Sequence, residues 1–391
     1  MHLLDCYSLN CGLKIREPFI MEKFFPLDVH KYITLDSSAT FPARQYDYWA
    51  DVVSSLQPIL EKHGISILNI GDSEQGYERT YDLRNQASAN QTAYIINGSL
   101  LHLSVDGFSN HLASYFDKKL VSLFGESPPE NNAPVFSGDS NCRFLTPSAS
   151  TGNFSYSAQE SPKSINSITP ESITESVCSL LNVDYDYPFK TLFIGDQYNS
   201  KSVELVPKGN PIDASSLNID SLIMRMDLSF DENCLAQQLQ INKCSIITEK
   251  PIDLNLLRHF RGSISQFVYL IGNVDSKQYV EDLFRSGVQC LLMTEKKGEE
   301  LNALKFKYLN TGKIHQRMQG VKPKELEGVN LDNVYYRSSK YIISDGKAYY
   351  NRAALEQGLP VDMVGSNSFL KAIDSDLFWK DCDSLYLTEK V

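Results

Sequence analysis

The chain has 391 residues and a formal net charge of −11 at pH 7. This length exceeds what one hydrophobic core usually supports and predicts two domains of roughly 150–200 residues each. The acidic balance provides no overall positive field toward a phosphate backbone, which disfavours a general nucleic-acid-binding function.

The eight cysteines are scattered, with no CxxC pair and no matching histidine spacing. This distribution favours a reduced, cytoplasmic chain over a zinc site or a disulfide scaffold. No apolar run approaches the roughly 18 residues that cross a bilayer, and the amino terminus lacks the basic-then-apolar order of a signal peptide. We therefore expect a soluble, cytoplasmic protein without a membrane span.

Strands and helices alternate along the first part of the chain. Apolar residues recur at helical spacing from Trp49 to Leu60 and stop at Gly64, which predicts a helix with a kink at Pro58. Such alternation is typical of a parallel sheet with helices on its faces. The strands predicted here are 32–35, 65–70, 100–105 and 120–124.

Residues 105–125 place polar side chains in the loop between two of these strands. Asp106 follows the first of the two strands directly, and His111 comes five positions later in a short helical run. Loops at the carboxyl ends of parallel strands form the ligand clefts of α/β domains. We therefore expect a binding site in this loop.

Two signals mark the end of the first domain. Residues 146–167 are rich in Ser, Pro, Asn and Gly and are predicted to form a surface loop or linker. A helix then begins with Thr169 as its N-cap, Pro170 at its first position and Glu171 near the positive end of its dipole.

A second alternating series follows, so the predicted fold class is α/β with two Rossmann-like domains. Helices are expected around 235–239 and 279–284. The aromatic tail, 335–391, is expected to be less regular and to cover an edge of the second domain. The strands predicted in this series are 191–194, 221–228, 244–248, 267–271, 289–293 and 306–309.

Three segments of the first domain resemble a known family. They are LDSSATFPARQY at 35–46, DGFSNHLA at 106–113 with the following LFG at 123–125, and ITPE at 168–171. In this order they resemble the nucleotide-sugar-binding half of the heptosyltransferases, glycosyltransferase family 9. Residues 1–5 resemble the segment that precedes that half, and the likeness extends to about residue 183.

The segments also depart from the family pattern. The family has Lys where Arg44 stands and Trp where Tyr46 stands, and here Gly107 is followed by the bulky Phe108. Arg44 keeps the positive charge, and its forked guanidinium can hold a diphosphate through paired hydrogen bonds. Phe108 leaves the identity of the sugar open.

The resemblance implies a GT-B architecture. Residues 1–183 would bind the donor and residues 184–391 would form the acceptor side, with the donor domain first, as in a circular permutation. The implied activity is metal-independent, inverting transfer of a sugar from a nucleotide-diphosphate-sugar donor. The acceptor would be a glycan, a lipid-linked glycan or a lipopolysaccharide-type molecule, and no cofactor is expected.

The leaving diphosphate must be held by groups that stabilise negative charge. Arg44 and the hydroxyl groups of Ser37, Ser38 and Thr40 are suited to this task, together with free amides at a helix start. The structural alternative for Arg44 is a solvated charge at the beginning of a helix.

Three further residues are candidates for the sugar side of the donor site. Asp106 and Gly107 lie in the loop, where the Asp106 carboxylate would accept hydrogen bonds from sugar hydroxyls, and His111 would face the phosphates or the sugar. The alternatives are that Asp106 caps the following helix and that His111 is structural.

The base that deprotonates the acceptor has a less specific signal. Asp196 follows the predicted strand 191–194, where an α/β fold presents catalytic side chains, although an aspartate there can also form a turn. Asp227 and His259 are further candidates. No DxD-like metal motif is convincing, so no metal site is predicted.

Two other functions stay open. The first is a non-catalytic nucleotide- or sugar-binding protein that has the donor fold without the base. The second is a glycosyltransferase that modifies nucleic-acid bases, which the acidic net charge disfavours.

Overall fold

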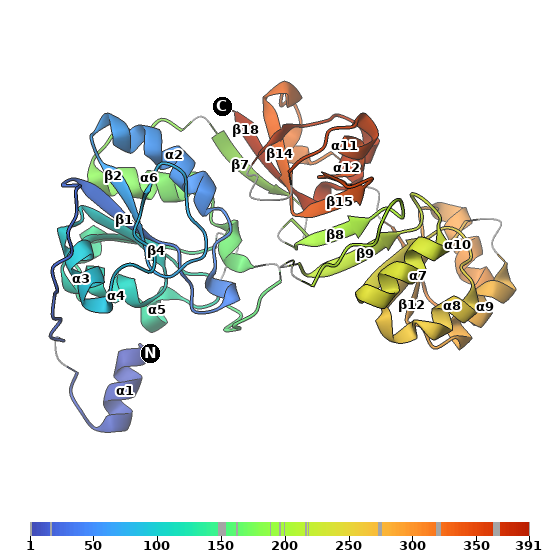
Figure 1. Cartoon of the computed structure of the whole chain (residues 1–391), viewed down its shortest axis with the longest axis horizontal. Helices are drawn as coiled ribbons and strands as arrows, with labels where there is room; N and C mark the ends of the chain where they lie inside the picture. Colours follow the sequence, from blue (N-terminus) through green and yellow to red (C-terminus); the bar gives the residue numbers. More distant parts are fainter. Residues whose placement is uncertain are drawn as a thin grey trace. The chain divides into compact units, whose positions relative to one another are not determined.

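The computed structural model describes residues 2–15, 18–147, 154–161, 163–187, 189–194, 197, 198, 200–215, 217, 219–272, 276–317, 322–362 and 368–390. The chain divides into two compact units, Met1–Thr191 with Lys390–Val391, and Leu192–Glu389. Figure 1 shows both as mixtures of helices and strands.

The first unit is built on a six-stranded sheet in the order β3-β2-β1-β4-β5-β6, with every neighbouring pair parallel. Parallel pairing places the carboxyl ends of all six strands at one edge of the sheet, where α/β folds bind their ligands. The strands are β1 (Tyr32–Asp36), β2 (Ser66–Ile70), β3 (Tyr81–Asp82), β4 (Leu101–Val105), β5 (Lys119–Leu123) and β6 (Cys142–Leu145).

Helices cover this sheet. Helix α2 (Trp49–Lys62), which contains Pro58, packs beside α6 (Pro170–Leu181), and Ser55 Oγ lies 2.5 Å from Thr174 Oγ1 between them. Thr169 caps α6 as predicted, since its hydroxyl accepts a hydrogen bond from the Ser172 amide at 3.3 Å. The remaining helices are α1 (Leu3–Cys11), α3 (Ala89–Gly98), α4 (Phe108–Tyr115), α5 (Pro129–Asn132) and the short 3₁₀ helices Pro42–Arg44, Asp139–Asn141 and Ser164–Ser167.

The second unit contains an eight-stranded sheet in the order β13-β12-β11-β10-β9-β8-β15-β16. Its pairs are parallel except β15 with β16, so the predicted α/β class with parallel sheets is confirmed in both units. The strands are β8 (Ser202–Leu205), β9 (Ser221–Arg225), β10 (Cys244–Thr248), β11 (Ile264–Leu270), β12 (Cys290–Thr294), β13 (Ile314–Gln316), β15 (Lys340–Ser344) and β16 (Lys347–Tyr349).

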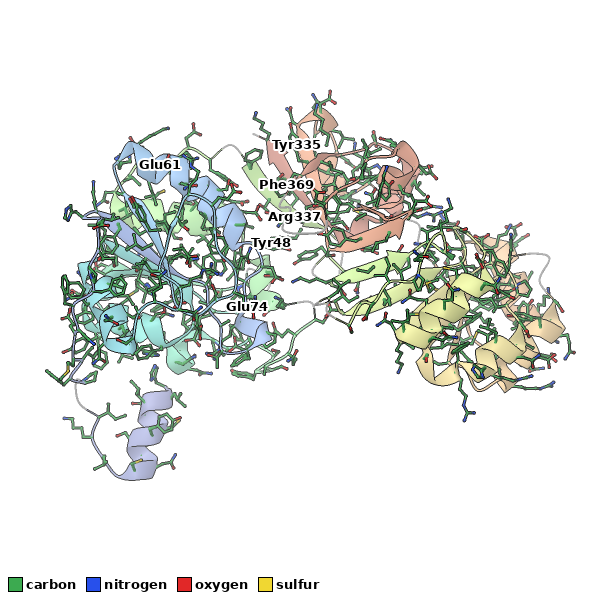
Figure 2. All side chains as sticks on the ribbon, in the orientation of Figure 1. Tyr48, Glu61, Glu74, Tyr335, Arg337 and Phe369 are labelled. Carbon is green, nitrogen blue, oxygen red and sulfur yellow. The ribbon has the colours of Figure 1, made fainter. Side chains whose placement is uncertain are left out.

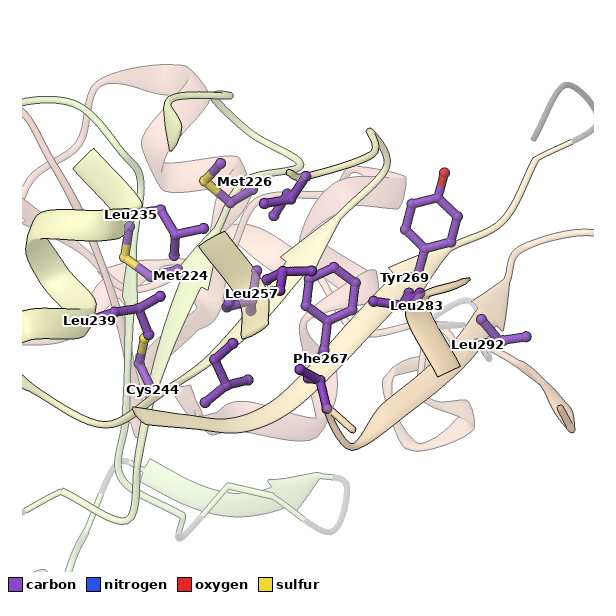
Figure 3. Packing of buried hydrophobic residues seen from close by; sticks show 14 of the residues in the cluster. Met224, Met226, Leu235, Leu239, Cys244, Leu257, Phe267, Tyr269, Leu283 and Leu292 are labelled. Atoms are coloured by element: carbon purple, nitrogen blue, oxygen red, sulfur yellow. The ribbon is translucent and has the colours of Figure 1, made fainter. Parts of the chain in front are cut away.

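One continuous apolar core lies between this sheet and its helices. Figure 3 shows Met224, Phe267 and Leu283 within it, and all three are almost fully buried. Burial of this apolar area is the main source of the unit's stability. The helices are α7 (Glu232–Ile241), α8 (Leu254–His259), α9 (Lys277–Arg285) and α10 (Gly298–Lys307), with a 3₁₀ turn at Arg261–Ser263.

A four-stranded sheet in the order β17-β14-β18-β7 completes the second unit. Its own core includes Tyr336 and Phe378. The Arg337 guanidinium lies 5.1 Å from the ring centres of both Phe369 and Tyr386. Figure 2 labels Arg337 and Phe369. The elements of this part of the second unit are β7 (Phe189–Ile194), β14 (Val334–Ser338), β17 (Leu370–Lys371), β18 (Leu385–Lys390), α11 (Arg352–Gln357), α12 (Asp376–Lys380) and the 3₁₀ helices Lys324–Leu326, Leu331–Asn333 and Cys382–Ser384.

Three expectations for this half of the chain were wrong. The predicted strand 306–309 is instead the end of α10 and the turn after it. Phe306 and Leu309 are 81% and 72% exposed, so these apolar residues do not form a buried strand. The strand at 191–194 exists as part of β7 but belongs to the four-stranded sheet, so it does not open the parallel series. The tail is regular: β15 and β16 extend the parallel sheet, and the rest has its own core.

One buried titratable group in the first sheet predicts how acid destabilises the fold. His102 in β4 is fully buried, its Nδ1 lies 2.9 Å from Thr34 Oγ1, and burial lowers the pKa of its ring to about 3. The unfolded chain takes up a proton below about pH 6.5, while the folded chain does not. The free energy of unfolding therefore falls as the pH drops from about 6.5 toward 3.

A His102→Gln variant has no ring to titrate, and its amide can still bond to Thr34. We expect the acid-unfolding midpoint, measured by circular dichroism, to move to lower pH than in the wild-type chain. Identical acid midpoints for the two chains would contradict this role of His102.

Candidate functional site

The two main motif segments of the first unit meet through Arg44. This residue ends the 3₁₀ helix after β1, and its Nη1 lies 2.9 Å from Asp106 Oδ2 at the end of β4. Its Nε lies 2.7 Å from Oε1 of Glu126, which follows β5. The Arg44 side chain is 18% exposed, so the reading of Arg44 as a solvated helix-start charge is wrong.

Asp106 is a buried member of this group. The N-cap of α4 is Gly107, and no side chain caps that helix, so the reading of Asp106 as a helix cap is also wrong. Its Oδ2 accepts a hydrogen bond from the Asn132 amide. Burial raises the pKa of Asp106 to about 6; the Arg44 charge opposes this shift, and the Glu126 charge adds to it.

Glu126 is a site residue that the sequence analysis missed. It is 3% exposed, its Oε1 accepts hydrogen bonds from Arg44 and from the Ser127 hydroxyl, and its Oε2 has no partner in the described part of the chain. A buried oxygen without a partner costs free energy. The signal in the sequence that could have identified it is its position directly after the LFG segment at 123–125, at the end of the next predicted strand.

The resulting cluster carries a net negative charge. One arginine charge and two carboxylate charges sum to −1 when both Asp106 and Glu126 are ionised. Protonation of Asp106 makes the cluster neutral. The cluster can therefore accept hydrogen bonds from hydroxyl groups at neutral pH. Its electrostatic repulsion of a bound anion is weakest below about pH 6, where Asp106 is protonated.

Two of the three hydroxyl groups of the predicted phosphate grip form hydrogen bonds inside the protein. Ser38 donates its amide, at 3.1 Å, and its hydroxyl to Asp36 Oδ1. Ser37 is buried and donates to Ser73 Oγ at 2.9 Å, whereas Thr40 is exposed. These bonds shape the turn after β1 and compete with any ligand for Ser37 and Ser38.

Asp36 joins this turn to the start of α4. Burial raises the pKa of its carboxyl group, and hydrogen bonds from Ser38 and from Ser109 of α4 oppose that shift. The backbone of Gly71 passes close by with φ +86°, and a Cβ there would lie 2.6 Å from Ser38 Oγ. A glycine is therefore required after β2 for the two loops to pack.

His111 lies one turn inside α4 and is half-buried. Burial lowers the pKa of its ring, and the neighbouring His2 lowers it further, so His111 is neutral at pH 7. His2 caps α1 and places its Nε2 2.9 Å from the Ala133 carbonyl oxygen. A neutral His111 can exchange hydrogen bonds with a ligand but adds no positive charge.

Asp227 and His259, two of the predicted base residues, belong to the second unit. Asp196 lies outside the described residues. Asp227 is held by Arg225 through two bonds of 2.8 and 2.7 Å, with both side chains buried, so it is not free to act as a base and that expectation is wrong. Arg225 also pairs with Glu204, whereas His259 is exposed at the end of α8.

Among the residues that the structure describes, no group of three or more His, Cys, Asp or Glu side chains is arranged to hold a metal ion. Among the same residues, no helix combines the length and the apolar character that crossing a bilayer requires.

Comparison with known proteins gives structural matches only. No family model matches the chain, and no curated protein sequence matches it. Part of the chain is similar in structure to ADP-heptose lipopolysaccharide heptosyltransferase II of E. coli, with 17% identity and a TM-score of 0.32 over 46% of this chain and 51% of that one. A family 9 glycosyl transferase of Veillonella parvula matches with 15% identity and a TM-score of 0.33 over 46% and 50%.

The E. coli heptosyltransferase WaaC, solved with ADP, matches with 13% identity and a TM-score of 0.30 over 45% of this chain and 54% of that one. The chain thus spans about half the length of the proteins it matches. Likeness at these scores carries no argument about activity, so the functional proposal rests on the residues of the cluster.

The Arg44 cluster predicts a pH-dependent loss of stability in one variant. Arg44→Met leaves Asp106 and Glu126 buried without their cation, which costs about 3–5 kcal/mol at pH 7. Loss of Arg44 raises the pKa of Asp106 further, so the folded variant takes up a proton and the cost shrinks as the pH falls toward 5. Urea unfolding at several pH values measures this difference.

The matched control is Arg79→Met, which removes an ion pair with Glu61 whose side chains are 64% and 48% exposed. Exposed pairs contribute about 0–1 kcal/mol. Equal losses in the two variants, or a loss that does not change with pH, would contradict the buried cluster.

Proposed function

We propose that the protein is a glycosyltransferase that takes a sugar from a nucleotide-diphosphate-sugar donor. The observation that carries this proposal is the contact of Arg44 with Asp106 at 2.9 Å. Segments 35–46 and 106–113 both resemble donor-binding motifs. Arg44 and Asp106, one from each segment, meet at the carboxyl edge of a parallel sheet, where ligands of α/β folds bind.

The cluster offers chemistry for a sugar linked to a diphosphate. Asp106 and Glu126 would accept hydrogen bonds from sugar hydroxyls through their carboxylate oxygens. Glu126 Oε2 is buried and receives no hydrogen bond from any described residue. Arg44 uses Nε and Nη1 for these two carboxylates. Nη1 also lies 3.5 Å from the Asp106 carbonyl oxygen, and the guanidinium lies over the Phe41 ring. The N–H groups of Nη2 are therefore the ones proposed to bind a phosphate oxygen.

In the proposed reaction the acceptor hydroxyl oxygen attacks the anomeric carbon as the bond to the diphosphate breaks. The hydroxyl proton passes to a base, and the diphosphate leaves with the electron pair of the broken bond. Arg44 stabilises the charge that develops on the diphosphate. Asp196 remains the proposed base, and the mode remains inverting and metal-independent with a glycan or lipid-linked glycan as acceptor.

We assign the two Rossmann-like parts to donor and acceptor roles by the same proposal. The first unit would bind the donor and the second the acceptor, in a GT-B-type architecture with the donor part first, as in a circular permutation. The all-parallel first sheet and the parallel series β8–β13 of the second unit are compatible with these roles.

A binding protein without catalysis is the second candidate, and one observation favours it. Asp227 is a candidate base of the second unit that the structure describes, and its carboxylate is ion-paired with Arg225. A donor site without a base would bind a nucleotide sugar and release it unchanged. Transfer to nucleic-acid bases is a third candidate, and retention on duplex DNA at physiological salt would support it.

The donor-site proposal predicts which variants lose ligand affinity. Arg44→Lys keeps the charge but loses the fork, and Asp106→Asn removes a carboxylate, so both should weaken binding of the nucleotide sugar by roughly tenfold or more. Glu126→Gln removes one repelling charge and should weaken binding less. Thermal-shift titration against a panel of nucleoside diphosphate sugars measures this, since ligand at a hundred times its Kd stabilises by about 2.7 kcal/mol.

Arg79→Lys, away from the sheet edge, serves as the control and should bind like the wild-type chain. Unchanged affinity in both Arg44→Lys and Asp106→Asn would refute the donor site. Binding without transfer or hydrolysis across a panel of acceptors would favour the non-catalytic alternative.

A further inference from the structure

The second unit has a topological switch point between β8 and β15. These two strands are parallel neighbours, but the chain leaves β8 toward β9 on one side and leaves β15 toward β16 on the other. The β15–β16 hairpin turns at Asp345 and Gly346 with φ of +50° and +72°, as two-residue hairpin turns do. The connections after β8 and β15 therefore lead away from each other within the sheet.

A cavity of about 370 Å³ lies at this switch point, and its lining comes from both diverging connections. Leu205 at the end of β8, Met224 in β9 and Ile343 in β15 are buried apolar residues that form its floor. The loop after β8 and the β15–β16 turn form its two sides. The volume is within the range of small-molecule sites, about 300–1,000 Å³.

The two sides carry opposite charges. Lys208 follows β8, Asp345 follows β15, and neither side chain forms an ion pair within the described residues. On the Lys208 side, the amide N–H groups of Gly209 and Asn210 donate to no acceptor in that same part of the chain. One side therefore offers an ammonium and free amides, and the other offers a carboxylate.

The neighbouring polar residues of the cavity are already satisfied. Gln238 of α7 is buried, and its amide bonds to the backbone of Ile212 at 2.8 and 2.9 Å. The Cys234 thiol, at the start of α7, lies 3.8 Å from the Gly209 carbonyl oxygen. The cavity wall is thus fixed, and the groups free for a ligand are those at Lys208–Asn210 and Asp345.

We propose that this cavity binds a nucleotide, with one nucleoside monophosphate as its minimal ligand. A flat base would lie on the apolar floor of Leu205, Met224 and Ile343. The ribose hydroxyls would donate to the Asp345 carboxylate, and the phosphate would be held by Lys208 with the adjacent amides. These three surfaces match the three parts of a nucleotide, whereas an unmodified sugar phosphate would leave the apolar floor without a partner.

The site lies wholly within the second unit and does not depend on the Arg44 cluster. Its failure and the failure of the donor-site proposal can therefore be told apart by variants in each unit. The proposed donor site is tested by Arg44→Lys, and the cavity by substitutions at Lys208 and Asp345.

The test is isothermal titration of the full chain with nucleoside monophosphates and inorganic phosphate. Leucine is titrated as the competing ligand, because its ammonium, carboxylate and apolar side chain would match Asp345, Lys208 and the apolar floor. Lys208→Ala and Asp345→Asn should each weaken nucleoside monophosphate binding by roughly tenfold. The asparagine keeps the left-handed turn conformation, so the hairpin is retained. Lys243→Ala, at the amino-terminal end of β10, removes an exposed lysine from the opposite edge of the sheet and should bind normally.

Alkylation of Cys234, followed by peptide mass spectrometry, locates the ligand directly. Bound nucleotide should slow alkylation of Cys234 and leave the exposed Cys11 unaffected. The proposal is overturned if Cys234 is not protected or if Lys208→Ala binds like the wild-type chain. It is also overturned if inorganic phosphate binds as tightly as the nucleotide, or if leucine binds and no nucleotide does.

Discussion

The first unit is organised around one arginine held between two buried carboxylates. Arg44 reaches Asp106 at 2.9 Å and Glu126 at 2.7 Å, and so connects the loop after β1 with the ends of β4 and β5. Removing the cation would leave two buried charges unpaired, which is far more costly than losing an exposed pair. The same contact fixes the chemistry of the sheet edge: acceptors for hydroxyl groups predominate, and a single cation faces any phosphate.

The second unit uses a related device for a different purpose. Arg225 binds Asp227 and Glu204, and Lys340 extends the network to Asp381, with all five side chains buried. Here the charges join β8, β9 and β15 to Asp381, the residue after α12, and both carboxylate oxygens of Asp227 accept hydrogen bonds from Arg225. Asp227 is therefore a structural residue, and the groups available to a ligand lie at the diverging loops beyond β8 and β15.

The sequence predicted local features well where local rules decide them. The cap at Thr169 and strand β10 at 244–248 were foreseen, because capping and continuous apolar runs follow from neighbouring residues. Strand β8 was missed because Glu204 interrupts its apolar pattern, and the burial of that carboxylate depends on its pairing with Arg225 and Lys340. Glu126 was missed because its role depends on Arg44, which is 82 positions away.

The central claim is that Asp106 belongs to a ligand site whose charge is set by Arg44 and Glu126. The most direct measurement is an NMR titration of the Asp106 carboxyl carbon, without and with a nucleoside diphosphate sugar. We expect a midpoint near pH 6 in the free protein, raised further by the bound anion. A midpoint near the ordinary aspartate value of about 3.9 that the ligand does not move would contradict the account.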